Sequence, residues 1–261
     1  MDLRINGKTA LVLGASQGLG EAIAEKLAAE GSNLFIVARR EDVLGSIAER
    51  LRAEYSVSVT PITVDLADAD ATAAFADRVR TEIQPDMLVA NAGGPPPSVS
   101  TGIDREVWKR SAQMLLFSII NITEAAVESM KSKGWGRILA IGSSGVIQPI
   151  PNLAVSNTIR GAVAGFYKTL AAEVAGDGIT VNMILPGKID TARVGQLDTA
   201  RAEREGKTLV QVRKEIAASL PIKRYGTPEE FGTVAAFLLS EPAGYVTGQM
   251  TRVDGGMIRS I

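Results

Sequence analysis

The chain has 261 residues, with 28 lysines and arginines against 29 aspartates and glutamates, and it contains neither histidine nor cysteine. Without cysteine it has no disulfide, thiolate metal site or thiol nucleophile, and without histidine no imidazole base or Ser-His-Asp triad. A net charge of −1 gives no general attraction for nucleic acid or anionic lipid, so we expect neither partner, and we expect no metal.

Short apolar runs alternate with segments of helical periodicity. The first run, Thr9–Leu13, precedes a glycine-rich turn and a helix over Glu21–Ala28 that stops at Gly31. A second run covers Leu34–Ala38, and a charged helical segment extends from Glu41 to Ala53. Further strand-like runs lie at Val57–Val64, Met87–Ala90, Arg137–Ile141, Thr180–Ile184 and Met250–Val253.

This alternation is typical of a doubly wound α/β fold. Because the runs are apolar at successive positions, the strands should form a parallel sheet of about seven strands, buried on both faces by helices. We expect a single domain over residues 1–261. Residues 191–220 break the rhythm with many charges between scattered apolar residues. We expect a helical excursion there, which is either a substrate lid or an ordinary pair of surface helices.

The N-terminal residues 1–6 show no apolar signal segment, and the longest apolar stretch is too short to span a membrane. We therefore expect a cytoplasmic protein without a membrane partner. Two segments near the middle of the chain are less informative. The loop Gly93–Pro97 is stiffened by prolines and either shapes a substrate entrance or only rigidifies a turn. Met114, Leu116 and Phe117 are expected in the core or in a subunit contact rather than in a substrate wall.

A glycine-rich segment lies where the first strand passes into the first helix. Glycines in such a turn allow a sharp bend, approach of the backbone to a phosphate, and close packing of helix on strand. The helix N-terminus presents free N–H groups to the phosphate. The position inside a βαβ unit predicts a dinucleotide site rather than a purely structural turn. The residues expected to form it are Gly14, Ser16, Gln17, Gly18, Leu19 and Gly20.

The end of the second strand distinguishes the two nicotinamide cofactors. An acidic residue there would bind the ribose 2′-hydroxyl of NAD, whereas a cation suits the 2′-phosphate of NADP. Ala38 stands at this position and is followed by Arg39 and Arg40. A guanidinium can bind a phosphate through two parallel hydrogen bonds. We therefore expect NADP(H) rather than NAD(H), the alternative being that both arginines are solvated surface charges.

Further motifs follow one another from end to end of the chain. They are Asp65-Leu66, Asn91-Ala92-Gly93, Ile141-Gly142-Ser143, Asn182, Pro186–Thr191, Gly226–Glu230, Thr247-Gly248 and Val253–Gly256. Together with the glycine loop, this order resembles the short-chain dehydrogenase/reductase family, and in particular its bacterial 3-oxoacyl-carrier-protein reductases. The resemblance implies a Rossmann-type fold and an NADP(H)-dependent oxidoreductase acting on a ketone or a secondary alcohol. It also implies a homotetramer, with long helices near 101–130 and 153–175 and the C-terminal strand at interfaces.

The same resemblance implies contacts with each part of the cofactor. These would be Asp65 and Leu66 at the adenine, Asn91, Ala92 and Gly93 at the adenosine ribose, and Pro186, Gly187, Ile189 and Thr191 at the nicotinamide and its phosphate. Considered singly, some of these residues have structural explanations. Asp65 alone could be a helix N-cap, and Pro186-Gly187 alone could be a turn.

The catalytic residues of that family are largely replaced. The family uses a serine, then a Tyr-x-x-x-Lys pair thirteen residues on, with an asparagine on the preceding long helix. Alignment through Gly165–Ala171 places Ser156 at the tyrosine position and Arg160 at the lysine position. The asparagine position falls on Leu115, whereas Ser143 keeps the serine and its spacing. Arg160 would then also be a cofactor-binding residue, at the nicotinamide ribose.

Ser156 and Arg160 are four residues apart and so would share one face of a helix. A serine hydroxyl is a much weaker acid than a phenol, but a permanently charged arginine can hold a ribose hydroxyl and favour a developing alkoxide. In one hypothesis, Ser143 and Ser156 polarise a carbonyl oxygen, Arg160 positions the ribose and water supplies the proton. In a second, the chain is a catalytically impaired dinucleotide-binding protein with a sensing or scaffolding role. In a third, another group acts, Tyr167 being on the same helix.

Overall fold

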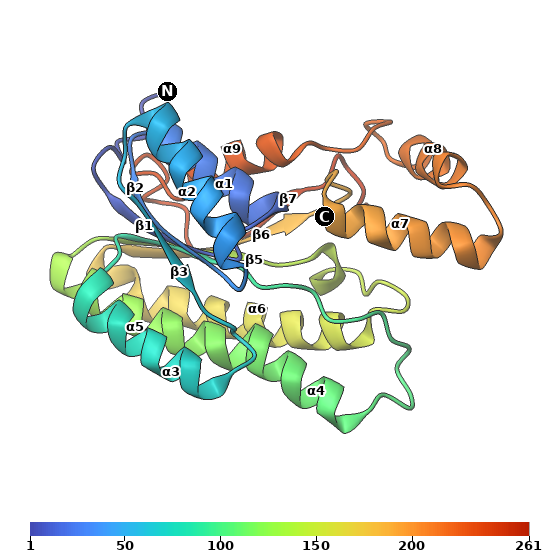
Figure 1. Cartoon of the computed structure of the whole chain (residues 1–261), viewed down its shortest axis with the longest axis horizontal. Coiled ribbons are helices and arrows are strands. Elements are labelled where there is room, and N and C mark those ends of the chain that lie inside the picture. Colours follow the sequence, from blue (N-terminus) through green and yellow to red (C-terminus); the bar gives the residue numbers. More distant parts are fainter. Residues whose placement is uncertain (261) are drawn as a thin grey trace.

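The computed structural model describes residues 1–260 and contains a seven-stranded, all-parallel sheet, as the sequence predicts (Figure 1). The strand order is β3-β2-β1-β4-β5-β6-β7. The strands are β1 (Thr9–Leu13), β2 (Asn33–Ala38), β3 (Val59–Thr63), β4 (Met87–Ala90), β5 (Gly136–Ile141), β6 (Ile179–Pro186) and β7 (Met250–Val253). The chain winds outward from β1 to β3 and then returns to start β4 on the other side of β1. Their carboxyl ends therefore part at β1 and β4, which is where ligands bind in such sheets.

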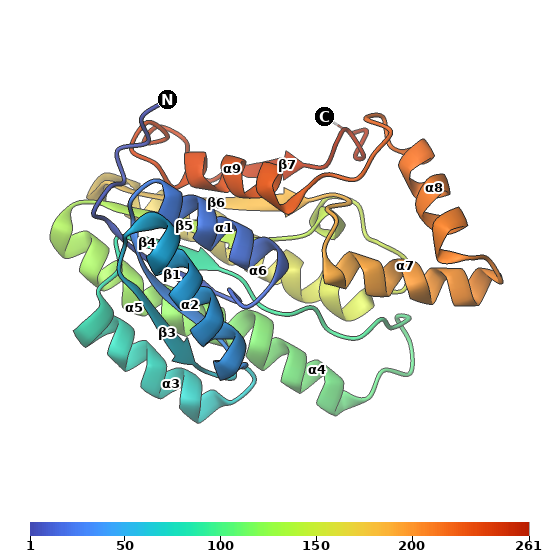
Figure 2. The same cartoon turned by 45° about the horizontal axis from the view of Figure 1, so that its top comes forward.

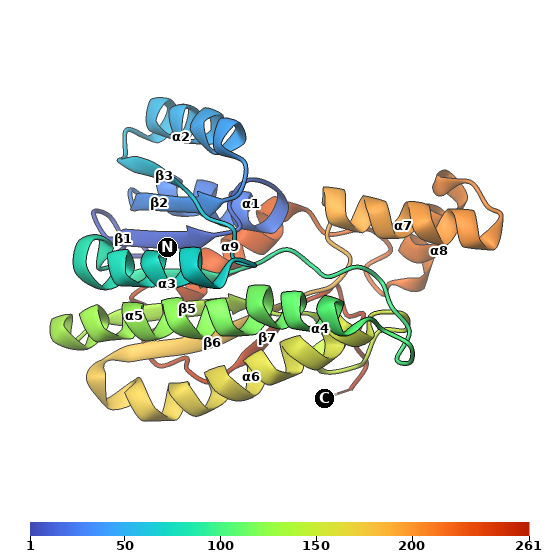
Figure 3. The ribbon, with the colours of Figure 1, turned by 60° about the horizontal axis from the view of Figure 1, so that its bottom comes forward.

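Helices cover both faces of the sheet (Figures 1 and 3). They are α1 (Gly18–Ala29), α2 (Glu41–Tyr55), α3 (Ala69–Arg78), α4 (Arg105–Ala112), α5 (Ser118–Lys133), α6 (Ala154–Val174), α7 (Ala192–Glu205), α8 (Leu209–Ser219) and α9 (Pro228–Leu238). Successive side chains of β1 point to opposite faces. Leu11 and Leu13 pack with α3, α5 and α6, whereas Ala10 and Val12 pack with α1, α2 and α9. The two faces of one strand thus contribute to two separate apolar layers.

The two edge strands depart from the expected burial on both faces. In β3, Thr60, Pro61 and Thr63 are exposed, and in β7 Met250 and Arg252 are exposed. An edge strand has a neighbour on one side only, and helices cover it less completely than they cover the centre. Proline is tolerated there because its missing N–H need not pair. The expectation of full burial is therefore correct for the central strands and wrong for the edges.

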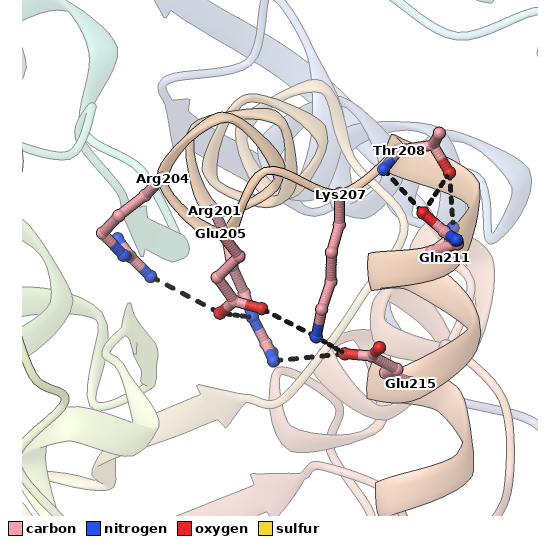
Figure 4. A network of polar contacts seen from close by, with 7 residues as sticks. All are labelled: Arg201, Arg204, Glu205, Lys207, Thr208, Gln211 and Glu215. Carbon is pink, nitrogen blue, oxygen red and sulfur yellow. Dashed lines mark hydrogen bonds and ion pairs between the residues drawn. The ribbon is translucent and has the colours of Figure 1, made fainter.

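The segment 191–220 is helical, as expected, and projects beyond the sheet as α7 and α8 (Figures 1 and 2). The turn between them begins at Gly206, which has a left-handed backbone with φ of 63°. Thr208 then caps α8 in a reciprocal box with Gln211. Glu205 and Glu215 share the ammonium of Lys207 at 3.1 and 2.8 Å, which links one helix to the other (Figure 4). These exposed ion pairs each contribute little, but together they hold α7 and α8 as one unit.

Long helical segments also occur where they were expected near 101–130 and 153–175. The first is α4 followed by a π-helical turn, Gln113–Phe117, and then α5, while the second is α6. Among residues 1–260, no helix has both the length and the apolar character required to cross a bilayer.

Candidate cofactor and substrate site

A cleft of about 610 Å³ opens at the carboxyl ends of the central strands. Its walls come from the segments that follow β1, β2, β4, β5 and β6, which lie far apart in the sequence. The predicted residues that line it are Gly14, Ser16, Gln17, Gly18, Leu19, Arg39, Arg40, Asp65, Leu66, Asn91, Ala92, Gly93, Ser143, Ser156, Arg160, Pro186, Gly187, Ile189 and Thr191. The fold therefore brings the proposed cofactor and catalytic residues to one place.

Gly20 is the exception among the predicted site residues. It is buried and does not line the cleft. A Cβ atom on Gly20 would collide with the backbone carbonyl of Gly14, so this glycine allows helix α1 to pack against the loop. The expectation that Gly20 contacts the cofactor is therefore corrected: Gly20 packs against the loop on the side away from the cleft.

The glycine loop has the geometry that a dinucleotide phosphate requires. Gly14 and Gly18 have φ values of 64° and 60°, which side chains rarely adopt. A Cβ atom on Gly14 would also lie 2.6 Å from Nδ2 of Asn91. At the start of α1, Gln17 has an extended backbone and its side chain caps no N–H group. The first N–H groups of the helix are therefore left free toward the cleft, and the loop fits a pyrophosphate.

Arg39 and Arg40 are both exposed at the rim of the cleft but have different surroundings. Arg40 donates from Nη2 to Oε1 of Gln17 at 2.9 Å and to the carbonyl oxygen of Ser16 at 3.2 Å. Arg40 thus braces the glycine loop. Within the described part of the chain, Arg39 makes no hydrogen bond or ion pair, so its guanidinium is available to a phosphate at the end of β2.

The adenosine end of the site is formed by the segments after β3 and β4. The carboxylate of Asp65 accepts from the backbone N–H of Ala67 at 3.0 Å and lies 3.7 Å from Nη2 of Arg110. The residue that caps α3 is Asp68 rather than Asp65, which removes the alternative explanation of Asp65 as an N-cap. Asn91 donates from Nδ2 to the carbonyl oxygen of Gly14 at 3.3 Å. Its amide therefore links the end of β4 to the glycine loop.

The segment after β6 forms the opposite wall. A Cβ atom on Gly187 would lie 2.5 Å from Cα of Asp254, so only glycine fits beside the C-terminal segment. Ile189 is 3% exposed and is mostly a core residue. Thr191 caps α7 by accepting from the N–H of Val194 at 3.4 Å. A Cβ atom on Gly18 would lie 3.5 Å from Cγ2 of Thr191, which places this wall directly beside the glycine loop.

Two serine hydroxyls reach the floor of the cleft. Ser143 follows β5 and its Oγ accepts from the backbone N–H of Gly145 at 3.0 Å, which leaves its own hydrogen free to donate. Ser156 lies in the first turn of α6 and is 9% exposed. Its hydroxyl has no hydrogen-bond partner among residues 1–260. Both serines can therefore donate to an oxygen atom placed in the cleft.

Arg160 lies one turn further along α6. It donates from Nη1 to the carbonyl oxygen of Ile141 at 2.7 Å and from Nη2 to that of Ala92 at 3.4 Å. No carboxylate within residues 1–260 lies within 4.0 Å of it. Burial, with a smaller contribution from the charge of Arg193, lowers the pKa of Arg160 to about 10. The guanidinium remains charged at neutral pH and is held by neutral carbonyl groups.

The residue predicted to stand at the family's asparagine position is Leu115, which is apolar. Leu115 lies in the π-helical turn and is 3% exposed. It borders a small cavity of about 10 Å³ that reaches Arg160 and is otherwise lined by apolar side chains and backbone. Such a space admits at most a single water molecule. The side chain of Leu115 therefore contributes no polar group to a proton relay.

Tyr167, on the same helix as Ser156, lies away from the cleft. Tyr167 is buried between helices, and its hydroxyl lies 2.7 Å from Oγ1 of Thr123. Burial raises the pKa of Tyr167, and the residue does not line the cleft. In the 260 described residues, no tyrosine contributes to the cleft wall. The hypothesis that Tyr167 acts in place of Ser156 is therefore wrong.

The cleft also contains residues that the sequence did not indicate. Met114, expected in the core or a subunit contact, contributes to the wall as well as packing on the core. The loop 148–153 lines the cleft and is fastened by Asn157, which donates from Nδ2 to the carbonyl oxygen of Ile150 at 2.9 Å. Arg193 of α7 reaches across to the carbonyl oxygen of Pro95 at 2.8 Å. The loop Gly93–Pro97 is therefore held to α7, and its residues Gly93 and Gly94 line the cleft.

Comparison with known proteins explains this arrangement. A family model described as "Enoyl-(Acyl carrier protein) reductase" matches residues 14–258. The chain belongs to the short-chain dehydrogenase/reductase family. It is 34% identical over 258 residues to the 3-oxoacyl-[acyl-carrier-protein] reductase of Escherichia coli K12, covering 98% of this chain and 99% of that one. It is 31% identical over 256 residues to the NADPH-dependent reductase BacG of Bacillus subtilis, covering 97% and 99%.

Solved structures of the family agree with the fold in detail. The L-sorbose reductase of Gluconobacter frateurii, determined with NADPH and L-sorbose, is 33% identical, with a TM-score of 0.94 and full coverage of both chains. An actinorhodin polyketide ketoreductase with NADPH has a TM-score of 0.90 at 30% identity. These relatives support an NADP(H)-dependent carbonyl reductase and favour NADP(H) over NAD(H). They give no support to the hypothesis of a catalytically impaired protein.

Proposed function

We propose that this short-chain dehydrogenase/reductase reduces a ketone, or oxidises the corresponding secondary alcohol, with an active site that contains neither the usual tyrosine nor the usual lysine. The observation that carries the proposal is the convergence of Ser143, Ser156 and Arg160 on the same cleft as the glycine loop and Arg39. A structural remnant would not require two serine hydroxyls and a buried cation beside a site that fits a dinucleotide.

Different residues around the cleft would contact different parts of the cofactor. The free N–H groups at the start of α1 would hold the pyrophosphate, and Arg39 would bind the 2′-phosphate at the end of β2. Asp65 and Leu66 would contact the adenine, with Asn91, Ala92 and Gly93 near its ribose. The segment from Pro186 to Thr191 would lie along the nicotinamide side. When bound, NADPH would supply the hydride.

The two serines would act on the carbonyl oxygen. Ser143 and Ser156 each have a hydroxyl hydrogen available, and hydrogen bonds to that oxygen strengthen as negative charge develops on it. Arg160 would hold a ribose hydroxyl with its remaining N–H groups, and its charge would stabilise the alkoxide. A guanidinium with a pKa near 10 gives up no proton at neutral pH, so the proton would come from water that enters the open cleft.

Cofactor binding and turnover test this proposal separately. NADPH and NADH are titrated while the fluorescence of the reduced nicotinamide is followed, and the NADPH complex is then mixed with diketones, quinones and acyl thioesters. Tighter binding of NADPH and its oxidation by at least one carbonyl compound support the proposal. Binding without oxidation by any of them contradicts it. The double variant Ser156→Tyr with Arg160→Lys is the companion, because turnover only in that variant shows an inactive native site.

Three further points belong to the proposal. The helices α7 and α8 would act as a lid within one domain, because Val194 and Leu197 of α7 line the cleft. A homotetramer is supported by apolar side chains left exposed where the family resemblance puts interfaces, including Phe117 beside α5 and Met250 in β7. Light scattering after gel filtration measures the mass of the assembly and so distinguishes a tetramer from a dimer or a monomer. A cytoplasmic location remains the expectation from the sequence.

A further inference from the structure

Two arginines at the substrate end of the cleft lack an anionic partner. Arg160 and Arg193 both line the cleft, and neither lies within 4.0 Å of a carboxylate anywhere in residues 1–260. Lys188, in the same wall, differs because its ammonium lies 3.6 Å from the buried carboxylate of Asp198. This end of the cleft therefore holds two positive charges that no carboxylate of residues 1–260 neutralises, in addition to Arg39 and Arg40 at the other end.

These arginines are fixed in place by backbone carbonyl groups. Arg160 is held at Ile141 and Ala92, and Arg193 at Pro95. A Cβ atom on Gly94 would lie 3.2 Å from Nη2 of Arg193, so the loop packs closely against the guanidinium. Burial lowers the pKa of Arg193, and each arginine retains N–H groups that these contacts do not use. A partly buried charge in such surroundings is normally paired, which points to an anion that binds from outside.

The 2′-phosphate of the cofactor cannot be that anion. It would bind beside Arg39 at the end of β2, whereas Arg160 contacts the ends of β4 and β5. In the strand order β2-β1-β4-β5, the outer two strands are three spacings apart, or about 14 Å. The pyrophosphate has its own donors at the start of α1. Arg193 thus remains for the molecule that reacts with the cofactor, while Arg160 would hold the ribose and add its positive charge nearby.

We propose, as an extension that rests on the proposed function, that the substrate is an anionic carbonyl compound. Its carboxylate or phosphate group binds Arg193, and the nearby charge of Arg160 makes the site more positive. Met114, Val194 and Leu197 supply an apolar wall beside Arg193, so the rest of the substrate has apolar character. Arg193 would be a specificity-determining residue, since it lies on α7 close to Thr191 and contacts the loop that contains Pro95.

The test uses the complex of the full-length protein with NADP⁺, which binds ligands but has no hydride to transfer. Benzoylformate, its uncharged methyl ester and inorganic phosphate are titrated into this complex by calorimetry. Native protein should bind benzoylformate or phosphate at least about tenfold more tightly than the ester, and the comparison of the two anions identifies the preferred group. Equal binding of acid and ester, or no binding of either anion, overturns the proposal.

Variants of Arg193 separate substrate binding from cofactor binding. Arg193→Gln should weaken anion binding at least about tenfold, Arg193→Lys should weaken it less, and both should leave the NADPH dissociation constant within about twofold. Arg204→Gln makes the same charge change on an exposed part of α7 and should bind like native protein. A loss of NADPH affinity in Arg193→Gln equal to the loss of anion affinity would show that Arg193 serves the cofactor. Failure of the proposed function is seen independently, as an absence of NADPH binding or oxidation in native protein.

Discussion

The guanidinium of Arg160 donates a hydrogen bond of 2.7 Å to the backbone carbonyl oxygen of Ile141, which joins helix α6 to the end of strand β5. A lysine has a single nitrogen and could not also reach the carbonyl oxygen of Ala92 in the same way, whereas the arginine fork contacts the ends of two neighbouring strands. In the alignment that places Arg160 at the family's lysine position, this residue attaches helix α6 to the ends of two strands. The guanidinium of Arg160 is held by two hydrogen bonds, and it loses a proton less readily than a lysine ammonium would.

The pH dependence of the reaction should reflect this charge. In the described part of the chain, only carboxylate, ammonium and guanidinium groups among the ionisable side chains line the cleft, and these types ordinarily titrate outside pH 6–9. The pKa of Arg160 is lowered to about 10, so its charge is present below that pH and is lost as the pH rises through it. We expect kcat/KM to be constant from pH 6 to 9 and to fall near pH 10.

A series of initial rates at constant ionic strength measures this profile. A fall in kcat/KM with an apparent pKa between 7 and 9 would contradict the account, because it would require an acid that the cleft does not contain. Arg160→Lys provides the comparison, since a buried ammonium loses its proton more readily than a guanidinium. Its profile should fall at a lower pH than that of the native protein.

The glycine loop allows a matched pair of stability measurements. Gly14→Ala places a side chain at φ of 64° and 2.6 Å from Nδ2 of Asn91, so it should cost at least about 2 kcal/mol in free energy of unfolding and abolish NADPH binding. Gly45→Ala makes the same change within α2. The added Cβ would meet no atom outside the helix's own backbone within 4 Å, so the variant should raise the free energy of unfolding by about 0.4–1 kcal/mol. Urea unfolding of both variants gives the two values. Equal stabilities would show that the loop is not under this constraint.

Much of the scaffold could be predicted because the individual strands and the glycine loop follow from local patterns. The runs at Thr9–Leu13 and Met87–Ala90 have the same bounds in the structure as in the sequence prediction. The role of Gly20 could not be predicted, because glycine spacing alone does not distinguish a glycine that contacts a ligand from one that lets a neighbouring backbone segment pack closely. That distinction depends on the distance between Gly20 and Gly14 across the turn.

Cofactor preference should depend on Arg39 more than on Arg40. Arg39→Ala removes the unpaired guanidinium at the end of β2 and should weaken NADPH binding about tenfold while leaving NADH binding nearly unchanged. Arg78→Ala, an exposed arginine on α3, is the control and should change neither affinity. Fluorescence titration with both cofactors measures the effect. A similar loss of affinity for NADH would mean that Arg39 does not contact the 2′-phosphate.

The attachment of α7, which we propose to be part of a lid, can be weakened by a substitution outside the cleft. Tyr225 donates from its hydroxyl to Oδ2 of Asp198 at 2.9 Å, and the side chain of Asp198 is 1% exposed. Tyr225→Phe leaves that buried oxygen without its donor, at a cost of about 1–3 kcal/mol. We expect faster hydrogen exchange in α7 and α8 and a higher KM for the carbonyl substrate, with NADPH affinity unchanged. Tyr245→Phe alters a fully exposed tyrosine and should change none of these; exchange confined to other helices would refute the attachment.

The substrate end of the cleft could be predicted less well from the sequence. Arg193 lies among the charges of residues 191–220, and nothing in the pattern separates it from the surface arginines Arg201 and Arg204. Its role emerges only because α7 starts beside Thr191 and directs Arg193 toward Pro95, almost one hundred positions earlier. Leu115 similarly lies in a π-helical turn that helical periodicity does not indicate. Both features depend on contacts between segments that are distant along the chain.

The proposed function depends on hydride transfer by the native site, with Ser156 and Arg160 in place of tyrosine and lysine. It is tested most directly in a single turnover of the native protein with NADPH deuterated at C4 of the nicotinamide, in the presence of anionic and neutral ketones. We expect deuterium at the carbinol carbon of at least one alcohol product, on one stereochemical face, and a rate reduced by at least about tenfold in Ser156→Ala. Tight binding of the cofactor with no deuterium in any product would contradict it.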